Sequence, residues 1–500
     1  MKVLLLAILV GGGLVLLLGR SVSCAAAEVA DMAVVNAQVI TVDQERPRAE
    51  AFAVRSGKIM AVGKNDKIKN MIGAKTKVID AKGRTVLPGF YDCHLHAQEL
   101  YDEMSPYGEI DCRPESTATI ESVIARLKAK AKITPKGKWV RGSRYQDTKL
   151  GRHLNRYDLD KVSTEHPVYV GHSSGHVAAV NSKALELAGA NARTKDPAGG
   201  AFDRDSEGEP TGVLRESAMD YVMSRGPSIP KPSREKRIQA QLKCFEAFME
   251  KGITSFGEAG ISPERLAFYR EVHKSRPTVR MYVMINSIYL DELKELIQAA
   301  GRGDEWIRLG AVKRFHGNSL SGQTCWLSAP YADRPDYFGI PPARSQKRLN
   351  DEVWEIHEAG LQNCIHSNGD REIDMVLKAY ELALQRLPRK DHRHRIEHCS
   401  VANEELLRRI KDSGVALATH SYVYEHGDKM EAYGAERWDM MHPNRSCLEM
   451  GIPIGGNSDY GVSAAWPMLR IQSMVTRKTS GGKVYGARQR ISIEDAIRIG

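Results

Sequence analysis

From Val86 onward, short apolar segments alternate with longer stretches in which apolar residues recur at helical spacing. This alternation predicts an α/β fold built from β/α units, because a helix after each strand returns the chain to the same end of a parallel sheet. Eight strand candidates occur, which predicts a TIM-like (β/α)8 barrel. They are Val86–Cys93, Ile253–Glu258, Val279–Ile285, Gly310–Phe315, Asn363–His366, Arg395–His398, Val415–Thr419 and Ile452–Gly456.

The stretches between these strands predict the helices of the barrel. In each of them the apolar residues fall on one side of a helix, as a helix packed on a sheet requires. The connections to the strands are short. The predicted helices are Arg237–Lys251, Pro263–His273, Leu290–Ala300, Asp351–Ala359, Ile373–Gln385 and Asn403–Asp412.

We expect the barrel over residues 86–480. Two segments before its second strand do not follow the β/α pattern. Residues 31–85 contain short strand-like runs and a hairpin signal at Ser56-Gly57-Lys58, and they predict the N-terminal half of a small β-sandwich domain. Residues 97–236 form a large insertion after the first barrel strand, which is expected over the mouth where barrels carry their chemistry.

Residues 481–500 begin a C-terminal segment, in which Ser492-x-x-Asp495 predicts the start of a helix. No strand-like run follows it that could pair with the N-terminal β-segment. We therefore expect either a small sheet that is sufficient by itself or a truncated chain.

The N-terminus has the features of an export signal. Met1-Lys2 gives a short positive start, Val3–Leu18 is apolar, and Ala25-x-Ala27 offers a peptidase site. We expect residues 1–27 to be a signal peptide and the protein to be periplasmic or secreted. An uncleaved membrane anchor or a lipid anchor is the alternative, although Ser21-Val22-Ser23-Cys24 is a poor lipoprotein box. No later segment has enough unbroken apolar residues to span a bilayer.

The composition limits the function classes. With 500 residues, 42% of them apolar, the chain can bury a sizeable core, which excludes disorder as its main state. The net charge of +10, from 72 basic and 62 acidic residues, is a modest and scattered excess, and no nucleic-acid-binding signature accompanies it. The eight cysteines form no CxxC pair, so they indicate neither a thiolate zinc site nor a disulfide framework.

Potential metal ligands gather at the predicted carboxyl ends of the barrel strands. His94 and His96 are two residues apart, so both imidazoles point to the same side of a strand. Neutral imidazole is a good ligand for zinc and similar divalent metals. A lysine, two further histidines and an aspartate lie at other strand ends, and structural histidines would not favour one end. These residues are Lys313, His366, His398 and Asp459.

This constellation resembles the amidohydrolase superfamily of metal-dependent hydrolases, in the YtcJ-like branch that includes N-substituted formamide deformylases. The similarity runs from about Asp31 to Gly500. The motifs together are specific to the branch, but not to a substrate. Where the branch usually has Asp-Gly-Ser after its lysine, this chain has His316-Gly317-Asn318. The matching stretches are Leu87–His96, Gly175-His176 with Asn181–Leu185, Pro210–Glu216, Val312-Lys313, His366–Asp370, Ile396–His398 and Ser458-Asp459.

The resemblance implies a set of ligands for one or two divalent ions, expected to be zinc. His94 and His96 would bind one ion, and His366 and His398 the other. Lys313 would be carboxylated by carbon dioxide and bridge the two ions.

The resemblance also implies the chemistry of the site. Asp459 would contact the metal and accept the proton of the attacking water. His176 and Glu216, from the insertion, would contact substrate or complete the ligand set. The expected reaction is hydrolysis of a non-peptide C–N bond in a small amide, formamide or cyclic amide.

Two other functions remain open for the same residues. One is a catalytically weak binding or regulatory relative that keeps the barrel, since the branch includes a protein named as an exoenzyme regulator. The other is a metal-dependent isomerase or lyase that uses the same ions. In each case we expect the protein to bind a small molecule. Assembly into a homo-oligomer is left open.

Overall fold

A computed structural model describes residues 28–114, 116–197, 200–420 and 423–500. The described chain falls into two compact units, one that ends at Pro88 and one over residues 89–500, which are treated separately below. The predicted signal peptide, residues 1–27, lies outside the described residues. Within them, no helix has the length and apolar character needed to cross a membrane.

The second unit is built on an eight-stranded sheet in which every paired neighbour is parallel. Its last strand approaches its first, where the Asp459 N–H donates to the His94 carbonyl at 2.9 Å, so the sheet is a nearly closed barrel. Each strand overlaps one that the sequence predicted. They are β8 (Phe90–Leu95), β15 (Ile253–Ile261), β16 (Arg280–Asn286), β17 (Ile307–Phe315), β18 (Gln362–Ser367), β19 (Arg395–His398), β20 (Ala416–His420) and β21 (Ile454–Asn457).

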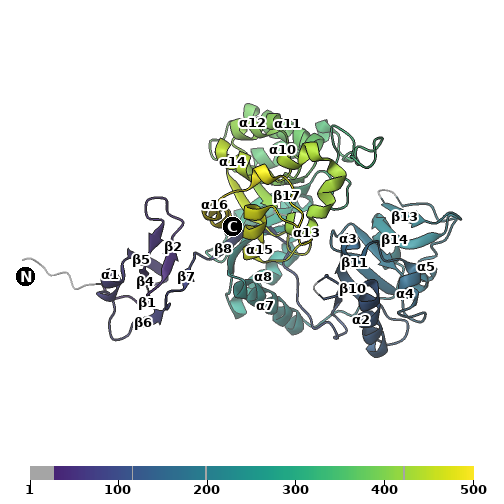
Figure 1. Ribbon diagram of the computed structural model, residues 1–500, viewed down its shortest axis with the longest axis horizontal. Helices are drawn as coiled ribbons and strands as arrows, with labels where there is room; N and C mark the ends of the chain where they lie inside the picture. The colour runs from purple at the N-terminus through teal and green to yellow at the C-terminus, as the bar shows by residue number, and fades with distance from the viewer. Residues whose placement is uncertain (1–27, 115, 198–199, 421–422) are drawn as a thin grey trace, which may run out of the picture. The chain divides into compact units, whose positions relative to one another are not determined.

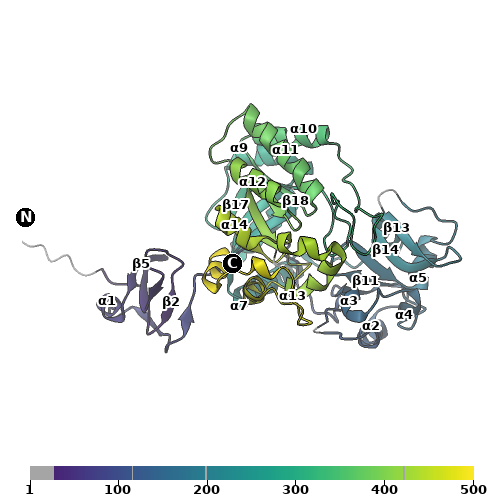
Figure 2. The same cartoon turned by 45° about the horizontal axis from the view of Figure 1, so that its top comes forward.

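Helices follow the strands and cover the outside of the barrel (Figures 1 and 2). Ser and Asn side chains begin most of them by accepting a backbone N–H of the first turn; Ser262, for example, accepts from Arg265. The six predicted helices are present. They are α7 (Arg234–Glu250), α8 (Pro263–Ser275), α9 (Leu290–Ala300), α10 (Gln346–Glu358), α11 (Asp370–Arg386) and α12 (Glu404–Ser413).

Helix α11 shows why these segments pack as they do. Its buried apolar residues recur at helical spacing and contact the outer face of β18 and β19 together with α10 and α12. Burial of each such side chain contributes about 1.5–3 kcal/mol. The buried face of α11 includes Ile373, Val376, Leu377 and Tyr380.

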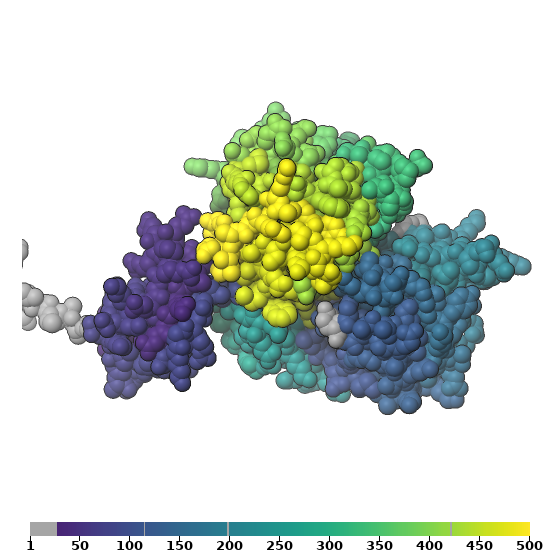
Figure 3. All heavy atoms as spheres, in the orientation of Figure 1, coloured from purple at the N-terminus to yellow at the C-terminus, as the bar shows by residue number. Residues whose placement is uncertain are grey.

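The insertion between β8 and α7 has a sheet and a core of its own. The sheet order is β13-β14-β12-β11-β10-β9, and two apolar clusters pack on it. Its atoms form a lobe coloured blue to teal in Figure 3. The strands are β9 (Ile110–Asp111), β10 (Val140–Tyr145), β11 (Val168–His172), β12 (Val177–Val180), β13 (Gly200–Arg204) and β14 (Pro210–Glu216).

The first unit contains two small sheets, of order β5-β4-β1-β6 and β3-β2-β7. The predicted hairpin joins β4 (Ala51–Arg55) to β5 (Lys58–Gly63), with Ser56 at φ 51° and Gly57 at φ 74°. Two successive positive φ values suit a tight hairpin turn, because they match the twist of the strands. The other strands are β1 (Met32–Val35), β2 (Gln38–Ile40), β3 (Arg48–Ala49), β6 (Lys77–Asp80) and β7 (Thr85–Val86).

Candidate metal centre

Three of the predicted ligands form a tight group at the carboxyl ends of β8 and β21. The ligand atoms of His94, His96 and Asp459 all lie within 4.8 Å of one another. The Asp459 Oδ1 atom is 3.4 Å from His96 Nε2 and 3.7 Å from His94 Nε2. Two imidazoles and a carboxylate at this spacing are a suitable ligand set for a divalent metal ion.

The two other predicted histidines join this group from β18 and β19, which pair with each other in the sheet. The ring centroid of His398 lies 4.9 Å from that of His94 and 4.7 Å from that of His366. The His398 Nδ1 atom is buried and has no hydrogen-bond partner among the described residues. An orphaned imidazole nitrogen beside other ligands fits a metal site, because metal binding would satisfy it.

Lys313, on β17, lies completely buried beside these histidines. Its Nζ is 3.2 Å from His94 Nε2. Burial lowers the pKa of Lys313 from its ordinary value and so favours the neutral amine. Burial therefore makes the neutral amine of Lys313 easier to form than that of an exposed lysine.

Hydrogen bonds fix which nitrogen of His94 and of His366 is free. The His94 Nδ1–H group donates to the buried carboxylate of Glu397, which leaves the Nε2 lone pair facing Asp459 and Lys313. The His366 Nε2–H group donates to the Asn318 carbonyl at 3.0 Å, which leaves the Nδ1 lone pair available to a metal. Burial lowers the pKa of His94 to about 4 and of His366 to about 3, so both rings are neutral at pH 7.

Buried ion pairs next to the candidate ligands hold them in position. The Glu397 carboxylate accepts a hydrogen bond from Arg395 Nε at 2.5 Å. Burial alone would raise the pKa of Glu397, but the neighbouring Arg395 and His94 hold it well below its usual range. Asp92 receives the Ser458 N–H at 3.0 Å and Arg470 Nη1 at 3.1 Å. Because Ser458 precedes Asp459, the Asp92 carboxylate anchors the turn that presents Asp459.

The ligands open into a cavity of about 330 Å³ that barrel and insertion residues line together. His176 lines it from the insertion, and its Nδ1 lies 2.9 Å from both carboxylate oxygens of Glu216. Glu216 itself lies behind His176 and is not part of the cavity wall. Burial alone would lower the pKa of His176, but the Glu216 carboxylate raises it above its ordinary value.

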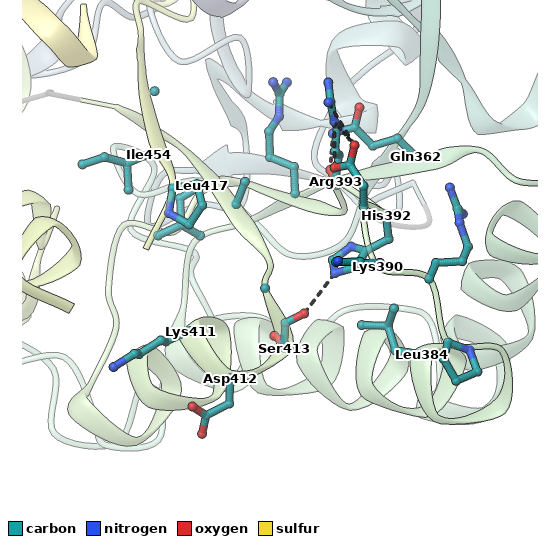
Figure 4. A pocket seen from close by; sticks show the side chains of 18 of the residues that line it. Gln362, Leu384, Lys390, His392, Arg393, Lys411, Asp412, Ser413, Leu417 and Ile454 are labelled. Atoms are coloured by element: carbon teal, nitrogen blue, oxygen red, sulfur yellow. Dashed lines mark hydrogen bonds and ion pairs between the residues drawn. The ribbon is translucent and has the colours of Figure 1, made fainter. Parts of the chain in front are cut away.

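A larger cavity, of about 1070 Å³, lies at the other end of the barrel (Figure 4). It is lined by residues that begin strands, such as Gln362, Arg395 and Ile454, whereas the metal-ligand candidates lie at or beyond the ends of the same strands. Cys93 lines this cavity, in keeping with its alternation to the side opposite His94. None of the predicted ligands lines it, so it is separate from the candidate metal centre.

Comparison with known proteins agrees with this geometry. A sequence model of the amidohydrolase family matches residues 77–499. The chain belongs to the amidohydrolase family. This membership supports a metal-dependent hydrolase. The matched residues include both the insertion and all eight barrel strands.

Relatives of this amidohydrolase extend over most of its length. It is 26% identical over 477 residues to YtcJ of Bacillus subtilis (strain 168), whose name places it among amidohydrolases, with 92% of this chain and 87% of YtcJ covered. It is 26% identical over 485 residues to the N-substituted formamide deformylase of Arthrobacter pascens, covering 94% and 88% of the two chains. A metal-dependent hydrolase of Pyrococcus horikoshii OT3 shares the fold, with a TM-score of 0.71, 24% identity and coverage of 93% and 90%.

The structure brings together every predicted metal-ligand residue of this amidohydrolase, and it adds residues to which the sequence reading gave no role. Glu397, Asp92 and Arg470 orient or anchor the ligands. Glu397 lies within Ile396–His398, one of the stretches that resemble the family, and Asp92 shares the side of β8 that carries His94. Arg470 comes from α15 (Pro467–Thr476), and nothing in its sequence surroundings indicates that it reaches Asp92.

Proposed function

We propose that this amidohydrolase uses one or two divalent metal ions, with zinc preferred, to hydrolyse a non-peptide C–N bond in a small amide, formamide or cyclic amide. The observation that carries the proposal is the convergence of His94, His96 and Asp459 within 4.8 Å, with two further histidine rings against them. The printed name of the Arthrobacter pascens relative, a formamide deformylase, favours an amide-type bond.

The residues present fit the metal. His94 and His96 would hold one ion together with Asp459, and His366 with His398 would hold a second. A bound divalent ion supplies Lewis acidity, which lowers the pKa of a water molecule towards about 7 and polarises a carbonyl group. The nitrogen donors favour zinc over magnesium or calcium, which prefer oxygen ligands.

Lys313 is proposed to carry a carboxylate on its side chain. The neutral Nζ amine would form a bond to the carbon of carbon dioxide and release one proton to water, which would give a carbamate with two oxygen donors. The product is an anion beside His94, at a position where a bare ammonium group would repel a metal. Burial that disfavours the ammonium form supports this step.

The remaining chemistry is assigned to side chains of the chain itself. Asp459 accepts a proton from the attacking water at a carboxylate oxygen and delivers it to the leaving nitrogen. The raised pKa of His176 keeps its ring protonated to a higher pH than a free imidazole. We assign His176 to the substrate oxygen as a hydrogen-bond donor, with Glu216 holding the ring in place.

The experiment begins with metal analysis of the purified protein and ends with a screen of amides, formamides and lactams. Hydrolysis predicts about one or two ions per chain and turnover of at least one class. Reaction in labelled water places the label in the acid product of a hydrolase and leaves an isomerase product unlabelled. A metal-loaded protein that turns over no compound in the screen would favour the binding or regulatory alternative.

Localisation and assembly are proposed from the sequence alone. Export by a cleaved signal peptide would remove residues 1–27, so the mass of the mature protein from the periplasm or medium tests it directly. A periplasmic protein that still begins at Met1 would contradict cleavage. The proposed partner is a small molecule rather than nucleic acid, and sedimentation analysis decides whether the chain forms a homo-oligomer.

A further inference from the structure

A second cavity, of about 350 Å³, adjoins the one that holds the candidate metal ligands. The two cavities share His172 and Ser321 in their walls. The second cavity lies between the insertion and loops at the carboxyl end of the barrel, and three cationic side chains line it: Arg215, Arg334 and Lys429. The single carboxylate in its wall is that of Asp147.

The charge of Asp147 is already offset. Its carboxylate is 3.0 Å from Lys429 Nζ and accepts from His172 Nε2 at 3.0 Å. Burial alone would raise the pKa of Asp147, but these partners hold it well below its usual range. Lys429 is therefore paired with Asp147, and the two arginines decide which ligand the cavity prefers.

Both arginines retain donors for a ligand. Arg215 uses Nε and Nη2 for Asp203, at 2.7 and 2.8 Å, and Arg334 uses Nη2 for Gln323 at 2.7 Å and Nε for Asp333 at 3.4 Å. Within the described part of the chain, neither Nη1 group has a hydrogen-bond partner. Asp203 and Asp333 balance the charges of the two arginines from outside the cavity wall, so the arginines face the cavity with free N–H donors.

Arg334 is also held in place by aromatic rings. Its guanidinium carbon lies 4.3 Å from the ring centroid of Tyr337 and 5.0 Å from that of Tyr331. Stacking of this kind orients a guanidinium group before a ligand arrives, which reduces the entropy lost on binding. Apolar side chains, Val177 and Ile340, complete the wall and suit a carbon chain better than an inorganic ion.

We propose that the second cavity binds a carboxylate group of the substrate, so that the preferred amides are acidic ones whose carboxylate is separated from the scissile bond by a short carbon chain. This inference rests on the proposed function, because it assigns the amide to the metal cavity and the acid to the cavity beside it. A planar carboxylate matches the paired N–H groups that guanidinium offers.

The test compares N-formyl-ω-amino acids of increasing chain length with their methyl esters, using the metal-loaded enzyme. We expect a lower KM for the acids, with an optimum chain length, and similar kcat for acid and ester. Arg334→Gln and Arg215→Gln should each raise KM for the acids roughly tenfold and leave the esters within about twofold. Arg334→Lys should recover part of the loss because it keeps the charge.

The exposed Arg445, which pairs with Glu449 and does not line the cavity, serves as the matched control. Arg445→Gln should change neither substrate. Equal KM for acids and esters in the wild type, or an equal effect of the variants on both, overturns the proposal.

Calorimetry with glutarate separates failure of this inference from failure of the proposed function. If no formamide is hydrolysed, the hydrolase proposal fails, while glutarate that binds the wild type and binds Arg334→Gln roughly tenfold more weakly still supports a carboxylate site. Glutarate that binds both proteins equally overturns the site. Glutarate that binds at Arg334 without competing with the acidic substrates indicates a separate effector and overturns the assignment to substrate.

Discussion

Replacing Glu397 with glutamine tests how a residue that touches no metal controls the metal site. The Glu397 side chain is fully buried and accepts from His94 Nδ1–H and from Arg395. An amide of the same shape carries no charge and has one accepting oxygen in place of two, so at least one of the three N–H groups that Glu397 binds loses its acceptor. We expect Glu397→Gln to weaken metal binding and to destabilise the protein, for two separate reasons.

Metal affinity should fall because His94 loses the carboxylate that fixes its orientation and makes Nε2 more basic. Loss of such a partner weakens metal binding by roughly 10–100-fold. Stability should fall because Arg395, whose side chain is 12% exposed, keeps a buried charge without its counter-charge. Removing one partner of a buried ion pair costs about 3–5 kcal/mol.

A double variant separates these effects. Arg395→Met with Glu397→Gln removes the unpaired charge, so denaturant unfolding should recover much of the lost stability, while titration against a metal buffer should still give weak binding. Glu449→Gln breaks the surface pair with Arg445, in which both side chains are more than half exposed, and it should cost less than about 1 kcal/mol. A folded Glu397→Gln protein with wild-type metal affinity would refute the proposed role of Glu397.

Three further variants test the site and the fold. Lys313→Ala should lower metal content and rate, and carbon dioxide with a short carboxylic acid should restore part of both; full metal and rate without rescue would exclude a bridging lysine. Asp459→Asn should reduce kcat by roughly 10²–10⁴ while the protein stays folded, measured on whichever amide the screen identifies. Burial lowers the pKa of His394 to about 2 from 6.5, so the folded protein binds fewer protons than the unfolded chain and loses stability as pH falls below 6.5. In His394→Asn, the free energy of unfolding measured in urea should fall less steeply between pH 6.5 and 4.5, by up to about 1.4 kcal/mol per pH unit. An unchanged dependence of this free energy on pH would contradict the reasoning.

Local pattern was enough to predict the barrel. Apolar runs and helical periodicity lie within single segments, and each segment can satisfy only one arrangement of its buried face. The Ser492 cap is equally local: its side chain accepts the Asp495 N–H and begins α16 (Ile493–Ile499). The boundaries of the strands shifted by a few residues, because pairing with neighbouring strands, and not propensity, decides where a ladder ends.

That the candidate ligand histidines gather in one place was also predictable, since parallel strands bring their carboxyl ends to one rim. Their partners were not. Arg470 lies 378 residues from Asp92, and Lys429 lies 282 residues from Asp147, so only the folded chain brings these charges together. A sequence fixes which side chains can carry a charge or bind a metal. The tertiary structure decides which of them lose contact with water and which partners they meet: burial lowers the pKa of Lys313, and hydrogen bonds from distant segments fix the histidine nitrogens.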